Sequence, residues 1–161
     1  MNKSLNFLPT FIFLFLFGGS SAVFGGEMQD GFDAYNREDF KEAVKFFRHS
    51  SEQGDALAQV LLGLMYDEGK GVTQDYIEAV KWYRHSAELG NASAQSNLGL
   101  MYAEGKGVLQ DYLLAHMWFN FASSNGSKNG MEGLNMVEKK MSPAQIEKAQ
   151  NMARTWKLTK K

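Results

Sequence analysis

The chain contains a direct internal repeat, and this feature constrains its fold more than any other. Residues 39–74 and 75–110 align without a gap at a period of 36, and two-thirds of the aligned positions are identical. Self-similarity at roughly 20 to 50 residues is typical of stacked repeats, each of which is too small to bury its own apolar face. A third, more divergent copy begins at Asp111. The pattern predicts an array whose core forms only when neighbouring units pack together.

Each copy carries the signals of two helices separated by a short turn. Asp39 and Glu42 have the spacing of a capping box, in which each side chain bonds the backbone amide of the other residue. Gly54 is suited to end the first helix in a left-handed conformation. Gly63 and Gly99 lie inside the second helices, where glycine costs about 1 kcal/mol relative to alanine. We therefore expect a close backbone approach there, where a first helix crosses a second. The expected first helices are 39–53 and 75–89, and the expected second helices are 55–68 and 91–104.

One face of each first helix combines a small residue with large aromatic ones. Ala79, Trp82 and Tyr83 stand at i, i+3 and i+4, which places them on one helix face. Trp118 and Phe119 hold the same aromatic places in the third copy. We expect these four aromatic residues to lie mainly in the core. The sequence as a whole predicts an all-α fold, an α/α superhelical solenoid of stacked antiparallel helix pairs.

The ends of the array depart from the repeat. The third unit, 111–141, keeps the first-helix pattern but loses the Leu-Gly-Leu-Met-Tyr string and the Gly-Lys-Gly-Val loop after it. Ser142, Pro143 and Gln145 then supply an N-cap, a first-turn proline and a capping-box glutamine. Such an atypical unit is what an array needs in order to stop stacking. The remaining expected boundaries are a capping helix at 143–156, a tail at 158–161, a lead-in helix at 28–36 and a whole array spanning 27–157.

The N-terminal segment differs in kind from the rest. Lys3 is its only charged residue, the run Phe11–Phe17 is wholly apolar, and a zone of small residues follows. A basic start, a short apolar core and a small-residue exit describe a secretory signal peptide. A membrane anchor is the alternative, but an anchor needs about 20 apolar residues and Pro9 interrupts this segment. We predict a signal peptide at 1–25, cleavage near 22–26, and a periplasmic or secreted mature chain with no stable membrane insertion.

Composition and motif content exclude several kinds of chemistry. Seventeen basic and 18 acidic residues give a net charge of −1, whereas a nucleic-acid-binding domain needs a clear basic excess. The chain has no cysteine, so disulfides, thiolate metal sites and a cysteine nucleophile are ruled out. No Ser-x-x-Lys, Gly-x-Ser-x-Gly, His-Glu-x-x-His or phosphate-loop motif occurs. We expect no catalytic residue, no cofactor and no nucleic-acid partner.

The repeated letters resemble a known family. Across 56–90 the chain reads Ala-x-Ala-Gln, Leu-Gly-Leu-Met-Tyr-x-Glu-Gly-Lys-Gly-Val-x-Gln-Asp-Tyr, Ala-Val-Lys-Trp-Tyr-Arg and Ala-Glu-x-Gly. This string is similar to the Sel-one-like repeat (SLR), a relative of the tetratricopeptide repeats, and the match covers about 39–141. The resemblance implies an α/α superhelix whose concave face binds proteins. Some exported bacterial relatives are linked to host interaction, envelope functions or β-lactams, but the β-lactam-associated ones carry paired cysteines that this chain lacks.

The polar side of the first helices repeats three residue types. They are Lys45, Arg48 and His49 in the first copy and Lys81, Arg84 and His85 in the second. Two interpretations remain open: a solvent face in which Glu42 and Glu78 pair with the lysines three residues on, or a stripe on the concave face that binds an acidic peptide or loop. Equivalent atoms on stacked helices lie about 8–10 Å apart, too far for two imidazoles to share one zinc ion, so we expect no metal site.

These observations predict a non-enzymatic, monomeric adaptor that binds a protein partner through the concave helical face. The six stripe residues are the candidate protein-binding residues. The alternative is a cell-envelope enzyme or cell-wall binder with weak β-lactam-related activity.

Overall fold

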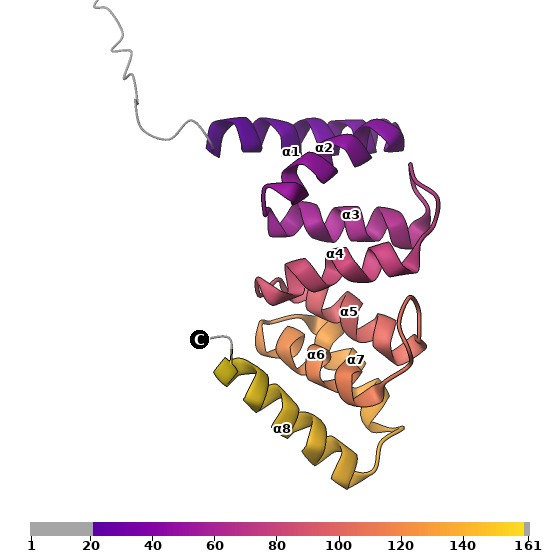
Figure 1. Cartoon of the computed structure of the whole chain (residues 1–161), viewed down its shortest axis with the longest axis vertical. Coiled ribbons are helices and arrows are strands. Elements are labelled where there is room, and N and C mark those ends of the chain that lie inside the picture. The colour runs from indigo at the N-terminus through magenta and orange to yellow at the C-terminus, as the bar shows by residue number, and fades with distance from the viewer. Residues whose placement is uncertain (1–20, 160–161) are drawn as a thin grey trace, which may run out of the picture.

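The computed structural model describes the backbone of residues 21–159 and the side chains of residues 26–156. Within that range the chain forms eight α-helices and no strand, and the helices stack along one axis (Figure 1). The helices are α1 (Ser21–Asn36), α2 (Phe40–Glu52), α3 (Ala56–Glu68), α4 (Tyr76–Glu88), α5 (Ala92–Glu104), α6 (Tyr112–Ser124), α7 (Lys128–Glu138) and α8 (Pro143–Thr159). The fold is the all-α helical repeat solenoid that the sequence predicted.

Side chains cap the first helices, but not as a reciprocal box. Asp39 accepts a hydrogen bond from the Glu42 amide at 3.3 Å, and Asp75 caps α4 in the same way. The prediction that Glu42 reaches back was wrong, because the Asp39 amide already donates to the carbonyl of Ala34 at 2.9 Å. The Glu42 carboxylate is thereby left for Lys45, which it meets at 2.8 Å.

The close approach predicted at the mid-helix glycines is present where a first helix crosses a second. A Cβ atom on Gly63 of α3 would lie 2.8 Å from ring atoms of Tyr83 on α4, and one on Gly99 of α5 would lie 2.8 Å from Phe119 on α6. The close approach is therefore between the second helix of one repeat and the first helix of the next. The contacts between α3 and α4 and between α5 and α6 are more extensive than those between α2 and α3 and between α4 and α5, which are the helix pairs within the units that start at Asp39 and Asp75. The array gains most of its cohesion between successive units.

The loops after the second helices repeat a contact as well as a sequence. The Lys106 ammonium lies 5.6 Å from the Tyr76 ring centroid, and Lys140 lies 5.5 Å from the Tyr112 ring. Such cation–π contacts fasten each loop to the start of the preceding first helix. The third unit has lost the Gly-Lys-Gly-Val letters, yet Lys140 supplies the same contact from a different local sequence.

The third unit also keeps its second helix. The sequence suggested that this half of the repeat was lost, but α7 occupies the place of α3 and α5 and packs against α5 and α6. It is shorter, with 11 residues against 13 in α5. A Cβ on Gly130 of α7 would lie 2.6 Å from the Cβ of Ala122 and from the backbone amide of Ser123. A glycine on α7 thus still allows a close approach to α6, although the sequence of this part of the repeat has changed.

The last helix begins as predicted and lies across α6. The Ser142 amide donates to the Gln145 side chain at 2.8 Å and the Gln145 amide donates to the Ser142 hydroxyl at 3.3 Å, a complete capping box. Trp156 packs edge-on to Trp118 with ring centroids 5.4 Å apart. Ala149 and Ala153 are buried, so small side chains bring α8 close to α6.

Both ends of the described chain differ from expectation. Helix α1 begins at Ser21 instead of residue 28, and α8 continues to Thr159 instead of ending at 156. Most of the predicted signal peptide, residues 1–20, lies outside the described residues, as do 160 and 161 of the predicted tail. None of the described helices is long and apolar enough to cross a membrane.

Candidate functional site

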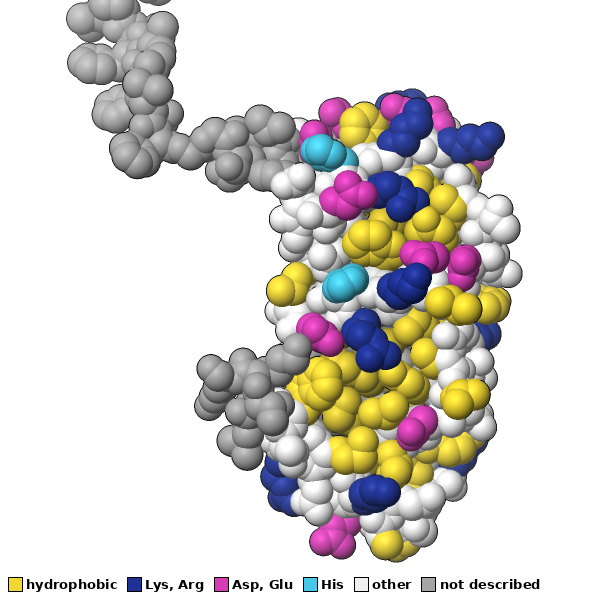
Figure 2. All heavy atoms as spheres, viewed as in Figure 1, with side chains coloured by type: hydrophobic (Ala, Val, Ile, Leu, Met, Phe, Trp, Pro, Cys, Tyr) yellow, Lys and Arg dark blue, Asp and Glu magenta, His cyan; other side chains and the backbone are white. Residues whose placement is uncertain are grey.

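The six stripe residues lie on successive first helices. We call the surface made by the outward side chains of α2, α4 and α6 the first-helix face. Figure 2 shows basic side chains and two histidines following one another down one face of the molecule, with an apolar patch below them. The stripe therefore ends where the apolar patch begins, and the contacts of its members decide which of them is free to bind a partner.

The two lysines of the stripe are held by carboxylates on their own helices. Lys45 meets Glu42 at 2.8 Å, and Lys81 makes the same ion pair with Glu78 one repeat later. The hydrogen bond from each glutamate raises the lysine pKa above its ordinary value. Both pairs are exposed, and exposed i, i+3 pairs contribute little stability. They match the solvent-face interpretation and leave little net charge at these two positions.

The two arginines have neutral partners. Arg48 donates to the Tyr66 hydroxyl at 2.5 Å, and Arg84 donates to the Tyr102 hydroxyl. Each guanidinium also lies over the ring of the same tyrosine, at 5.7 Å and 5.9 Å from the ring centroids. A phenol orients the guanidinium without cancelling its charge, and a guanidinium has five N–H donors. The arginines are therefore fixed cations with donors to spare. The tyrosine partners were visible in the repeat, but nothing in the sequence linked them to the arginines 18 residues earlier.

The two histidines have different neighbours despite their equivalent positions. His49 lies 3.4 Å from the Glu27 carboxylate of α1. His85 packs against Trp82 with ring centroids 5.9 Å apart, and Trp82 is only partly buried. The other three aromatic residues predicted for the core, Tyr83, Trp118 and Phe119, are buried.

Among the described residues no group of three histidines and carboxylates could hold a metal ion.

The stripe changes character in the third repeat. The positions equivalent to Lys81, Arg84 and His85 are Met117, Asn120 and Phe121, and Glu78 is replaced by Leu114. Helix α6 carries no acidic or basic residue apart from His116. The first-helix face is thus charged on α2 and α4 and apolar on α6, where α8 packs.

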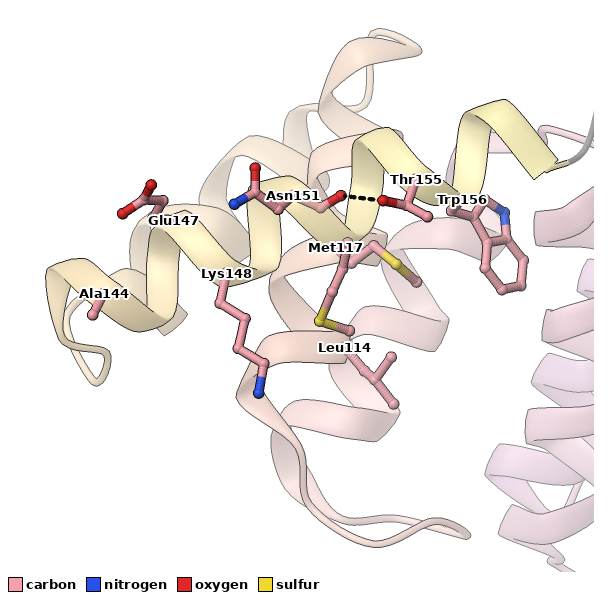
Figure 3. Close-up of a pocket in the computed structure, with 9 residues that line it drawn as sticks. Leu114, Met117, Ala144, Glu147, Lys148, Asn151, Thr155 and Trp156 are labelled. Carbon is pink, nitrogen blue, oxygen red and sulfur yellow. Dashed lines mark hydrogen bonds between the residues drawn. The ribbon is translucent and has the colours of Figure 1, made fainter.

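Helix α8 does not cover all of the apolar face of α6. A trough of about 730 Å³ runs between the two helices (Figure 3). We call it the α6–α8 trough. Its lining residues are Leu114 and Met117 of α6 and Ala144, Glu147, Lys148, Asn151, Met152, Thr155 and Trp156 of α8. Its size is in the range of ligand pockets, about 300–1,000 Å³, and no letter pattern indicated it.

Two polar contacts lie away from this face. His116 is fully buried and its Nε2 lies 3.0 Å from the Glu138 carboxylate of α7. The buried Tyr83 hydroxyl donates to Asp67 at 3.4 Å, and burial raises the pKa of Asp67. Both contacts join neighbouring helices and so contribute to the packing.

The fold and the first-helix face define a class of protein, a helical repeat array that presents the outward side of its first helices. The Sel1 repeat model matches residues 26–55, 56–91 and 92–127. The chain belongs to the Sel1 repeat family, as the repeat letters predicted, and repeats of this family generally mediate protein interactions. The model's boundaries fall half a repeat away from Asp39 and Asp75, so its units pair α3 with α4 and α5 with α6.

Solved structures from three bacteria share the fold. The crystal structure of c5321, a protective antigen present in uropathogenic Escherichia coli strains, is similar over 83% of this chain at 34% identity and a TM-score of 0.78. A Sel1 repeat protein from Oxalobacter formigenes matches over 73% at 27% identity and a TM-score of 0.63. Cysteine-rich protein B of Helicobacter pylori matches over 71% at 20% identity and a TM-score of 0.55, which is a likeness of fold alone.

The relatives differ from this chain in extent. The chain spans 29% of the length of c5321, 51% of the Oxalobacter protein and 98% of the Helicobacter protein. No curated protein matches the chain.

Proposed function

We propose that the chain is an exported, non-enzymatic adaptor that binds an acidic segment of a partner protein on its first-helix face. The observation that carries the proposal is the pair of arginines, each oriented by a neutral tyrosine at the same place in successive repeats. A fixed guanidinium suits the planar geometry of a carboxylate. Membership of the Sel1 repeat family supports a scaffold over an envelope enzyme.

Crosslinking on living cells tests the binding. A photo-crosslinker placed at exposed Glu88, next to Arg84 on the face of α4, should join the chain to a protein whose crosslinked peptide is rich in Asp and Glu. Arg84→Gln should reduce the yield several-fold, because a neutral amide cannot form a bidentate ion pair. Lys128→Gln on α7, exposed and away from the stripe, is the matched control. Equal yields from wild type and Arg84→Gln would contradict the proposal.

Export and assembly state are tested separately. The predicted signal at 1–25 supports export, and the mass of the mature chain recovered from the periplasm or medium should correspond to cleavage near 22–26. A cytoplasmic chain of full mass would refute export. We propose a monomer as the working form, which light scattering on the purified mature chain would verify. A labelled penicillin should leave no covalent adduct on the chain.

A further inference from the structure

The α6–α8 trough offers a second contact on the first-helix face. Its α8 residues recur at i, i+3, i+4, i+7, i+8, i+11 and i+12 from Ala144 to Trp156, which is one continuous helix face. At 1.5 Å per residue the trough is about 18 Å long. That is the length of roughly three helical turns, so its dimensions are those of a groove between two helices that can accept a third.

The walls of the trough are mainly apolar and deformable. Leu114 and Met117 form one side and Met152 and Trp156 line the other. Methionine side chains are flexible and polarizable, and they adapt to the shape of a bound apolar group. The apolar character is specific to this repeat, because the position of Leu114 is held by Glu78 on α4 and Glu42 on α2.

One charged group extends into the gap. In Figure 3 the Lys148 side chain extends from α8 toward the side on which Leu114 lies, whereas Glu147 points away from it. Lys148 is exposed and forms no ion pair within the described part of the chain. The trough is therefore mainly apolar, with the polar side chains of Asn151 and Thr155 on its α8 side and the positive charge of Lys148 at its open side, which complements an acidic side chain on an amphipathic helix.

Resting on the proposed function, we propose that the α6–α8 trough binds an amphipathic helix of the partner protein. The apolar side chains of that helix, at i, i+3 or i+4, and i+7, lie between α6 and α8, and one Asp or Glu pairs with Lys148. This is the helix-in-groove mode of recognition. The arginine stripe and the trough adjoin on the first-helix face, so one acidic, amphipathic segment can reach both.

Selection from a phage-displayed library of random peptides, long enough for four helical turns, tests the trough with a defined probe. The bait is the mature chain. Enriched peptides should carry the apolar spacing with at least one acidic residue and should gain helicity on binding. The Lys148→Glu substitution should weaken the binding of these peptides about tenfold, and Leu114→Glu should weaken it at least as much. Leu109→Glu is the matched control, since Leu109 is 90% exposed in the loop before α6 and does not line the trough.

The outcomes separate this inference from the proposed function. If Leu114→Glu lowers the thermal midpoint, exposed Ala144→Trp, which fills one end of the trough, takes its place. The peptides could bind the Lys148→Glu and Ala144→Trp variants normally and lose affinity for Arg84→Gln. That result would show that the trough is not the binding site and would leave the proposed function intact. No enrichment, or binding of dodecanoate in the trough in place of any peptide, would also overturn the inference.

Discussion

The glycines inside the second helices provide the sharpest test of how the units pack. Replacing Gly99 by alanine places a Cβ 2.8 Å from two ring atoms of Phe119 and 3.0 Å from a third. Ordinary contact begins near 3.4 Å, so the ring has to move by about 0.6 Å. The ring is also confined by Gly133 of α7, since a Cβ there would lie still closer to the same two ring atoms of Phe119.

The expected cost follows from two opposing terms. Overpacking of a well-filled core costs about 1–3 kcal/mol, and the better helix propensity of alanine returns about 1 kcal/mol. For Gly99→Ala the steric term should dominate, with a net loss of about 2 kcal/mol. Gly63→Ala should lose about 1 kcal/mol, because Tyr83 has only one glycine against it. Substitution at Gly133, which lies still closer to Phe119, should cost most.

Urea unfolding followed by circular dichroism measures these losses. With a slope of about 1–3 kcal/mol/M, a loss of 2 kcal/mol lowers the midpoint by roughly 1 M. Ser93→Ala, on the exposed side of α5, introduces the same residue into the same helix without a contact and should leave the midpoint unchanged. In a double-mutant cycle, Phe119→Leu should recover at least about 1 kcal/mol of the Gly99→Ala loss. If Gly99→Ala leaves the midpoint unchanged, as Ser93→Ala should, then Phe119 does not require a glycine at position 99.

Three further changes test other contacts. Gly107→Ala should cost about 3 kcal/mol or more, since φ is +67° and a Cβ would collide with the Tyr76 carbonyl; a stability within error of wild type would contradict this. Trp156→Ala should cost about 2 kcal/mol and accelerate amide exchange in α8 ahead of α4, whereas uniform exchange would argue against separate docking of α8. Burial raises the pKa of Asp67, so the folded chain holds that proton more readily than the unfolded chain. Stability from this group is present below the unfolded pKa and is lost as pH rises through the folded value. Asp67→Asn keeps an acceptor for Tyr83 and should therefore match wild type in acid and exceed it near neutral pH by less than about 1 kcal/mol; an advantage that grows toward acid would refute it.

Much of the architecture could be read from local signals. The 36-residue period, Asp39 and Asp75 as caps, and the Ser142 capping box each depend on residues close together in the sequence, and all appear in the structure. The Gly63 approach was predicted from a repeated local cost, but its partner was not. The spacing of residues in the sequence shows that a helix has a close neighbour, but it does not show which helix that neighbour is.

The candidate site divides along the same line. Recurrence alone located the stripe, and the lysine pairs with Glu42 and Glu78 follow from helical spacing. Arg48 and Arg84 bind tyrosines on the following helix, and this contact depends on how the two helices cross. Because tyrosine is a neutral partner, the charge of the two arginines is not offset, whereas that of the paired lysines is. These residues remain predicted binding residues until a partner is found.

The 36-residue repeat therefore determined the class of fold, because capping, periodicity and turn chemistry act over a few residues. Only the tertiary structure decided what the third repeat does. In the third repeat Leu114 and Met117 replace charged residues. In the tertiary structure α8 lies across α6 and leaves a trough that these two side chains line beside Lys148. That arrangement depends on contacts between segments more than 25 residues apart, which no local pattern encodes.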